Sequence, residues 1–113
     1  MIQYNDAITL YDAVIAKDTI TATSFIAKSD KRLKTNIKPF KTDKSILDVE
    51  VKEFDYINSN IHSLGMIAQD LQKVFPELVM ENESGYLSIV ESKLVYLLIN
   101  EVKDLKSQVN SLK

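Results

Sequence analysis

The C-terminal segment of the chain carries an apolar repeat that constrains its fold more than any other feature. Apolar residues there alternate spacings of three and four, with valine at the a positions and leucine at the d positions of a heptad: Val95, Leu98, Val102, Leu105, Val109 and Leu112. Beyond Asn100 all residues outside this repeat are polar. The pattern predicts a long helix over residues 88–113 that meets the same helix of other chains. A single amphipathic helix that packs on its own domain is the alternative.

Local patterns also suggest where this helix begins and how many helices its coiled coil contains. Ser88 followed by Glu91 fits a capping box, in which the serine oxygen accepts from a free amide and the glutamate reaches back. The repeat covers only about two and a half heptads, fewer than the three or four that define a coiled coil by themselves. Valine at a with leucine at d favours two-stranded coiled coils.

Composition excludes several classes of protein. A chain of 113 residues forms one small domain, or a small domain with an appendage. With no cysteine and one histidine, it can form neither a disulfide nor a Cys- or His-rich metal cluster. The net charge of −2 gives no overall preference for nucleic acid or an anionic membrane. We therefore expect no metal, no cofactor, no nucleic acid and no membrane as partners.

Charge is unevenly distributed along the chain. Residues 28–44 hold seven Lys or Arg against two Asp, whereas residues 47–91 are acidic. A solvated face explains the basic stretch, and a nucleic-acid patch is the alternative, although no motif that reads bases or phosphates accompanies it.

The rest of the chain reads as short strands, turns and one short helix. Residues 7–11 and 19–26 are rich in β-branched and aromatic residues and predict strands, either of a longer stalk or of a sheet edge that needs partner chains. Residues 46–56 alternate Leu47, Val49 and Val51 with charged residues, which is typical of a half-buried strand. We further expect a turn at 58–60, an amphipathic helix over 65–75 that Pro76 ends near Val74, a turn at 81–85 and a strand at 86–87.

A possible catalytic pair lies between the stalk-like segment and the remainder. Ser29 precedes Lys34 by five residues in the stretch Ser29-Asp30-Lys31-Arg32-Leu33-Lys34. A serine becomes a nucleophile when a neighbouring base takes its proton, and a neutral lysine can be that base. Serine and lysine are common residues, so these six residues alone are also compatible with a surface turn.

The neighbouring motifs give this pair its weight. Ser29 to Ile37 is followed by Phe54 with Tyr56, by Gly65-Met66-Ile67-Ala68-Gln69-Asp70-Leu71 running to Phe75-Pro76-Glu77-Leu78-Val79, and by Tyr86-Leu87-Ser88-Ile89-Val90 before the heptads. In this order, these features resemble the C-terminal intramolecular chaperone auto-processing domain of bacteriophage tailspikes, tail fibres and neck appendages. The resemblance covers about residues 28–113.

The resemblance implies an α+β fold with three parts. These are a short N-terminal β-stalk segment (residues 1–28), a small mixed domain within residues 29–113, and a long C-terminal helix (residues 88–113) that forms a trimeric coiled coil. It implies a homotrimer that registers its own upstream fibre chains and then cuts itself between Lys28 and Ser29. The precursor would be a virion tail fibre or appendage assembled in the host bacterial cytoplasm, and the chaperone domain would be released after cleavage.

The resemblance also implies roles for individual residues. Ser29 is the nucleophile and Lys34 the base of a self-cleaving serine endopeptidase; Asp30, Arg32 and His62 are possible auxiliary residues. A free lysine has a pKa of about 10.4, so a base that works near neutral pH needs burial or nearby positive charge. Burial on trimer formation would link cutting to assembly. Two alternatives are a non-catalytic trimerisation or capping module that stays attached, and the processing domain of a membrane-tethered DNA-binding regulator.

Overall fold

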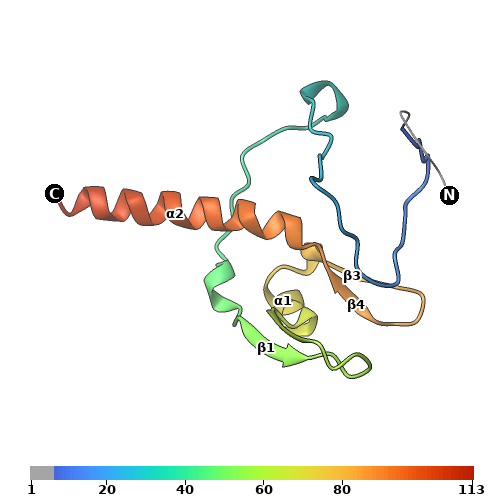
Figure 1. Cartoon of the computed structure of the whole chain (residues 1–113). Coiled ribbons are helices and arrows are strands. Elements are labelled where there is room, and N and C mark those ends of the chain that lie inside the picture. Colours follow the sequence, from blue (N-terminus) through green and yellow to red (C-terminus); the bar gives the residue numbers. More distant parts are fainter. Residues whose placement is uncertain (1–6) are drawn as a thin grey trace. The chain divides into compact units, whose positions relative to one another are not determined.

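The computed structural model describes residues 7–113, and the chain divides into two units, residues 1–38 and residues 39–113. The second unit holds four strands and two α-helices: β1 (Lys52–Asp55), β2 (His62–Gly65), α1 (Ala68–Val74), β3 (Val79–Glu81), β4 (Leu87–Ile89) and α2 (Leu94–Ser111) (Figure 1). Short 3-10 turns, η2 (Ile46–Asp48), η3 (Pro76–Leu78) and η4 (Glu91–Lys93), connect them. The expected mixed fold with a C-terminal helix is confirmed, and the trimeric coiled coil stays a prediction.

The strands form two antiparallel hairpins. In the first, Lys52 pairs with Gly65 and Asp55 with His62. The predicted turn at 58–60 is confirmed: Asn60, at φ 55°, donates its amide to the Tyr56 carbonyl at 2.9 Å. In the second hairpin β3 pairs with β4. The predicted turn lies between these two strands and includes Gly85, whose φ of 84° is favourable only for a residue without a Cβ. The strand after this turn begins at Leu87, one residue later than expected.

A small core holds the second unit together. Ile46, Val49, Leu71, Phe75 and Leu78 are buried, and Leu94 and Leu97 of α2 pack against them. As expected, α1 ends at Val74, because Pro76 cannot continue it and instead begins η3. It begins at Ala68 and not at residue 65, because Gly65 is the last residue of β2 and pairs with Lys52.

The strand predicted over residues 46–56 is wrong in its first half. Ile46–Asp48 is a 3-10 turn, and only Lys52–Asp55 is a strand. The Ser45 hydroxyl accepts from the Leu47 amide at 3.1 Å and so caps this turn. A 3-10 turn brings residues three apart onto one side. Ile46 and Val49 are therefore buried, whereas Leu47 is 71% exposed.

The predicted capping box is also wrong. Ser88 lies within β4 opposite Met80, so its backbone belongs to a sheet and cannot cap a helix. The α-helix begins at Leu94 after the turn η4, and its N-cap residue Lys93 makes no side-chain cap bond. The long helix itself is confirmed over residues 94–111.

The heptad seam of α2 does not pack on its own domain. All six seam residues, from Val95 to Leu112, are between 46% and 86% exposed. The contact with the core is made by Leu94, which lies beside the seam, and by Leu97, which lies on another side of the helix. The C-terminal part of α2 extends beyond the strands and α1 (Figure 1). The seam is thus free to meet other chains.

The N-terminal strands are absent from the single chain. Within residues 7–28 the structure has no strand, so the strands predicted at 7–11 and 19–26 are wrong for an isolated chain. Two short strands bury too little surface to be stable alone, and their backbone groups need a neighbouring strand. Residues 1–6 of the expected stalk segment lie outside the described residues.

Candidate functional site

The structure brings Ser29 and Lys34 into direct contact. Residues Lys31–Leu33 form the 3-10 turn η1, in which the Leu33 amide donates to the Asp30 carbonyl at 3.0 Å. This turn folds the chain back between the two residues. The Lys34 Nζ then donates to the Ser29 Oγ at 2.6 Å. The two expected members of the catalytic pair are therefore neighbours in space as well as in sequence.

Asp30 and Arg32 stabilise the turn between them. The Asp30 Oδ1 accepts from the Arg32 amide at 2.8 Å. The Arg32 guanidinium also donates to both carboxylate oxygens, at 3.1 Å and 3.0 Å. These side-chain bonds, followed by the backbone bond, hold the pKa of Asp30 below its ordinary value, and the same contact raises the pKa of Arg32. In this chain both residues serve the turn that positions Ser29 and Lys34.

The whole site is open to water in the single chain. Every residue from Lys28 to Lys34 is exposed. The Lys34 Nζ and the Ser29 Oγ are thus in contact at an exposed position. A lysine that acts as the base of a proton transfer must be a neutral amine, a form that burial favours.

His62 belongs to the first hairpin of the second unit. Its Nδ1 lies 2.6 Å from the Asp55 Oδ1, and its Nε2 lies 3.2 Å from the Glu53 Oε1. Asp55 is also its backbone partner in the β1–β2 ladder. All these contacts lie within the hairpin, so the imidazole there fastens two strands, and an auxiliary role in catalysis stays a prediction.

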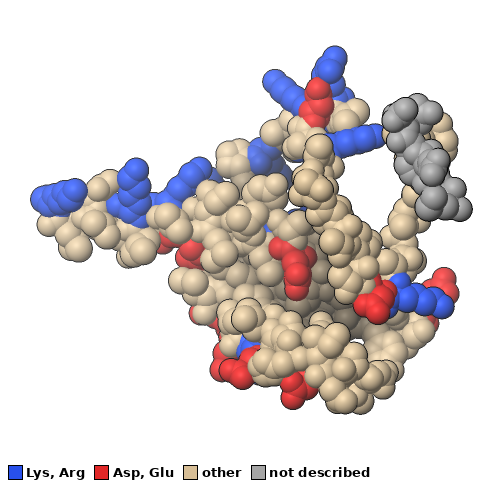
Figure 2. Space-filling model, viewed as in Figure 1, with Lys and Arg blue, Asp and Glu red and all other residues tan. Residues whose placement is uncertain are grey.

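Charge follows the pattern seen in the sequence. Lys and Arg side chains gather around η1 and project along α2 (Figure 2). Among the described residues no cluster of His, Cys, Asp or Glu could hold a metal ion, and no helix is long and apolar enough to span a membrane.

A comparison with known families matched part of the chain. Residues 29–80 match the Peptidase_S74 family, described as the chaperone of endosialidase. The resemblance predicted from the motifs is confirmed, and the match begins at Ser29. Neither the curated proteins nor the solved structures gave a match.

The match to the endosialidase-chaperone family supports a chaperone role for the matched segment and an association with a tail spike or fibre protein. The family name also marks the domain as peptidase-related, and its phage tail context fits a virion-related location.

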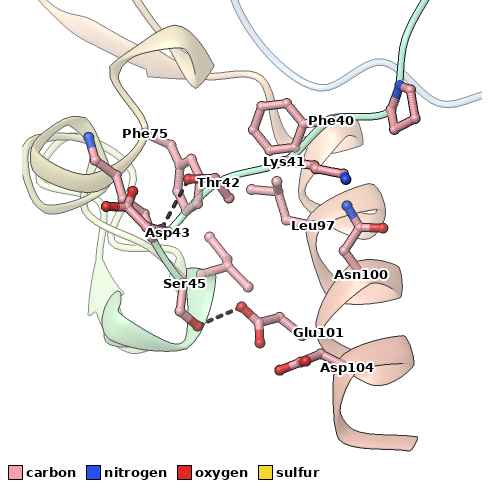
Figure 3. Close-up of a pocket in the computed structure, with 13 residues that line it drawn as sticks. Phe40, Lys41, Thr42, Asp43, Ser45, Phe75, Leu97, Asn100, Glu101 and Asp104 are labelled. Atoms are coloured by element: carbon pink, nitrogen blue, oxygen red, sulfur yellow. Dashed lines mark hydrogen bonds between the residues drawn. The ribbon is translucent and has the colours of Figure 1, made fainter. Parts of the chain in front are cut away.

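A second feature lies partly outside the family match. The second unit has an open cavity of about 540 Å³ between the segment 39–46, Phe75 and one side of α2 (Figure 3). On its wall the Ser45 Oγ donates to the Glu101 Oε1 at 2.6 Å, and both residues are half-buried. Sequence reasoning missed this pair. The available signals were a serine just before the apolar pair Ile46-Leu47, and a glutamate that directly precedes a seam valine.

Proposed function

We propose that this chain is the C-terminal intramolecular chaperone of a phage tail fibre or spike. In this function it forms a homotrimer, registers the upstream fibre chains and releases itself by autoproteolysis between Lys28 and Ser29. The observation that carries the proposal is the 2.6 Å contact of the Lys34 Nζ with the Ser29 Oγ, at the first residue of the family match.

The cleavage proceeds in two steps. The Ser29 Oγ attacks the carbonyl carbon of Lys28 while Lys34 removes the hydroxyl proton. A C–O bond forms, the C–N bond breaks, and the proton passes to the departing Ser29 nitrogen. The resulting ester joins the Lys28 carbonyl to the Ser29 Oγ. Water then hydrolyses the ester to a Lys28 carboxylate and a free N-terminal Ser29. Because nucleophile and target share one chain, no entropy of bimolecular encounter opposes the first step.

Assembly supplies the activation that the open site lacks. Burial disfavours the charged form of a lysine and so lowers its pKa. Ser29 and Lys34 are exposed in the single chain, and the seam of α2 is exposed as well. In the proposed function, chains assemble through this seam, and the assembled trimer also covers Ser29 and Lys34. Cleavage would then occur only after correct assembly, so that the chaperone would be released only once the fibre chains are in register.

A non-catalytic trimerisation or capping module that stays attached is the second candidate. It is favoured by the exposed seam, which can assemble chains without any dyad, and by the exposure of the Ser29–Lys34 pair. In this function the 2.6 Å contact would be a surface hydrogen bond.

The experiment is the expression of the full chain, followed by denaturing gel, intact mass and N-terminal sequencing. A fragment of residues 29–113 with Ser29 at its N-terminus is expected. Ser29→Ala removes the nucleophile and abolishes this fragment. Lys34→Arg also abolishes it, because a guanidinium keeps its charge and cannot take the proton. The matched controls Ser24→Ala and Lys31→Arg leave cleavage intact. An uncut wild-type chain with a trimeric native mass would establish the second candidate instead.

A further inference from the structure

The residues at the e and g positions, which flank the seam of α2, show a pattern of charge. With Val95, Val102 and Val109 at a, the g positions before them are Leu94, Glu101 and Gln108. The e positions, which follow the d leucines, are Ile99, Lys106 and Lys113. The helix therefore has one acid at g and two bases at e, and no acid at e.

This order is complementary to itself in only one orientation. In a parallel, in-register coiled coil, each g residue contacts the e residue five positions later on the neighbouring helix. The resulting contacts are Leu94 with Ile99, Glu101 with Lys106, and Gln108 with Lys113. The first is apolar, the second joins opposite charges and the third is a polar contact. An antiparallel arrangement places e against e, which brings lysines toward one another.

Glu101 is also held within its own chain. Its Oε1 accepts from the Ser45 hydroxyl at 2.6 Å, at the end of the segment that precedes the buried Ile46 (Figure 3). Among the described residues, Ser45 is the only side chain recorded as bonded to this carboxylate, so the Oε2 can accept a further donor. Lys106 is exposed and lies little more than one turn further along the helix.

We propose that α2 docks in parallel and in register against second copies of this chain, with Glu101 of one copy bound to Lys106 of the next. Glu101 is the residue that links each domain to the coiled coil, because the same carboxylate accepts from Ser45 in its own chain. The inference rests on the proposed assembly and names its surface, orientation and charge pair.

The apolar contact at the start of the helix supports the same arrangement. Ile99 is 44% exposed and lies outside the a and d positions. A stripe of a and d residues alone is the narrow seam of a coiled coil, and an apolar e residue widens it. In the parallel arrangement Leu94 of the neighbouring copy lies beside Ile99, while still packing against its own core.

Charge reversal tests the pair in the full chain, with Ser29→Ala in every sample so that cleavage does not alter the species. Lys106→Glu places two acids together in each contact and is expected to raise the concentration for half-assembly by about fivefold or more. Lys103→Glu makes the same charge change at a b position, away from the seam, and serves as the control. The double variant Glu101→Lys with Lys106→Glu restores assembly to within about twofold, since the Ser45 oxygen can also accept from a lysine.

Cross-linking tests the orientation, and the chain has no cysteine that would interfere. Val109→Cys places a thiol at an a position, where in-register parallel helices bring the same residue of each copy together. Rapid disulfide formation is expected there, and not for Ser107→Cys at an f position on the opposite side.

The outcomes separate this inference from the proposed function. A wild-type chain that is monomeric by native mass overturns the assembly itself. If the chain assembles but Lys106→Glu weakens it no more than Lys103→Glu, the charge pair is wrong while the trimer stands. If Ser107→Cys cross-links as fast as Val109→Cys, the orientation is wrong.

Discussion

At the scale of single residues, Asp30 organises the turn between Ser29 and Lys34. It accepts from the Arg32 amide and from both guanidinium nitrogens that face it. These bonds hold the turn that places Lys34 against Ser29. The side chains at 29 and 34 are connected by several rotatable bonds, so without this turn their contact would be one of many arrangements.

The turn is expected to depend on the charge of Asp30. Its pKa is lowered in the folded turn, so its stabilising effect is complete above the ordinary value of 3.8 and is lost as the pH falls through the lower folded value. An NMR titration of Ser29→Ala, followed at the Asp30 carboxyl carbon and the Arg32 amide, should give a midpoint below 3.8 at both nuclei.

Arg32→Gln provides the control for this titration. It removes the guanidinium, which is the larger cause of the lowered pKa, and keeps the backbone bond. The midpoint should therefore move up toward 3.8. A wild-type midpoint at or above 3.8 would show that the turn is not held by Asp30.

At the scale of elements, residues 46–49 show where alternation in the sequence is ambiguous. The order Leu47, Asp48, Val49, Glu50, Val51 matches a strand with one buried face. In the structure Val49 is buried, and both Leu47 and Val51 are more than half exposed. The cap formed by Ser45 selects a 3-10 turn here, and the buried partner of Val49 becomes Ile46.

Truncation of neighbouring residues distinguishes the two arrangements. Ile46→Ala removes buried methyl groups from the core and should lower the free energy of unfolding by about 2–4 kcal/mol. Leu47→Ala removes an exposed side chain and should change it by about 0.5 kcal/mol or less. Urea unfolding of both variants in the Ser29→Ala chain measures the difference. Equal losses at the two positions, or a larger loss at Leu47, would favour the strand.

The same comparison shows what could be predicted from the sequence. The helix α2, the end of α1 at Val74 and both hairpin turns follow from strong local signals, namely heptads, Pro76, Asn60 and Gly85. The short 3-10 turn and the position of Ser88 in a strand depend on tertiary pairing, which no local pattern specifies. For the site, the residues of the dyad came from motif order, whereas their 2.6 Å contact depends on η1. The Ser45–Glu101 bond joins residues 56 positions apart and could not be predicted locally.

At the scale of the whole molecule, the single chain leaves much apolar surface uncovered. Among residues 7–113 five are buried, and the exposed large apolar residues are far more numerous, including all six of the α2 seam. Isolated exposed apolar residues are common on soluble proteins, but a continuous stripe marks an interaction surface. This exposed stripe supports the proposed assembly, in which copies of the chain would cover it.

If assembly activates the dyad, disrupting the seam must stop cleavage at a distance from the site. A triple variant removes every d leucine of the seam: Leu98→Ser, Leu105→Ser and Leu112→Ser. Full burial of each leucine contributes about 1.5–3 kcal/mol to the free energy of assembly. The triple variant should be monomeric by native mass and should remain uncut on a denaturing gel. The control Leu47→Ser with Ile57→Ser replaces exposed apolar residues outside α2 and should cut like the wild type. A triple variant that is monomeric and still cuts fully would show that the turn η1 alone activates Lys34, and that release does not wait for assembly.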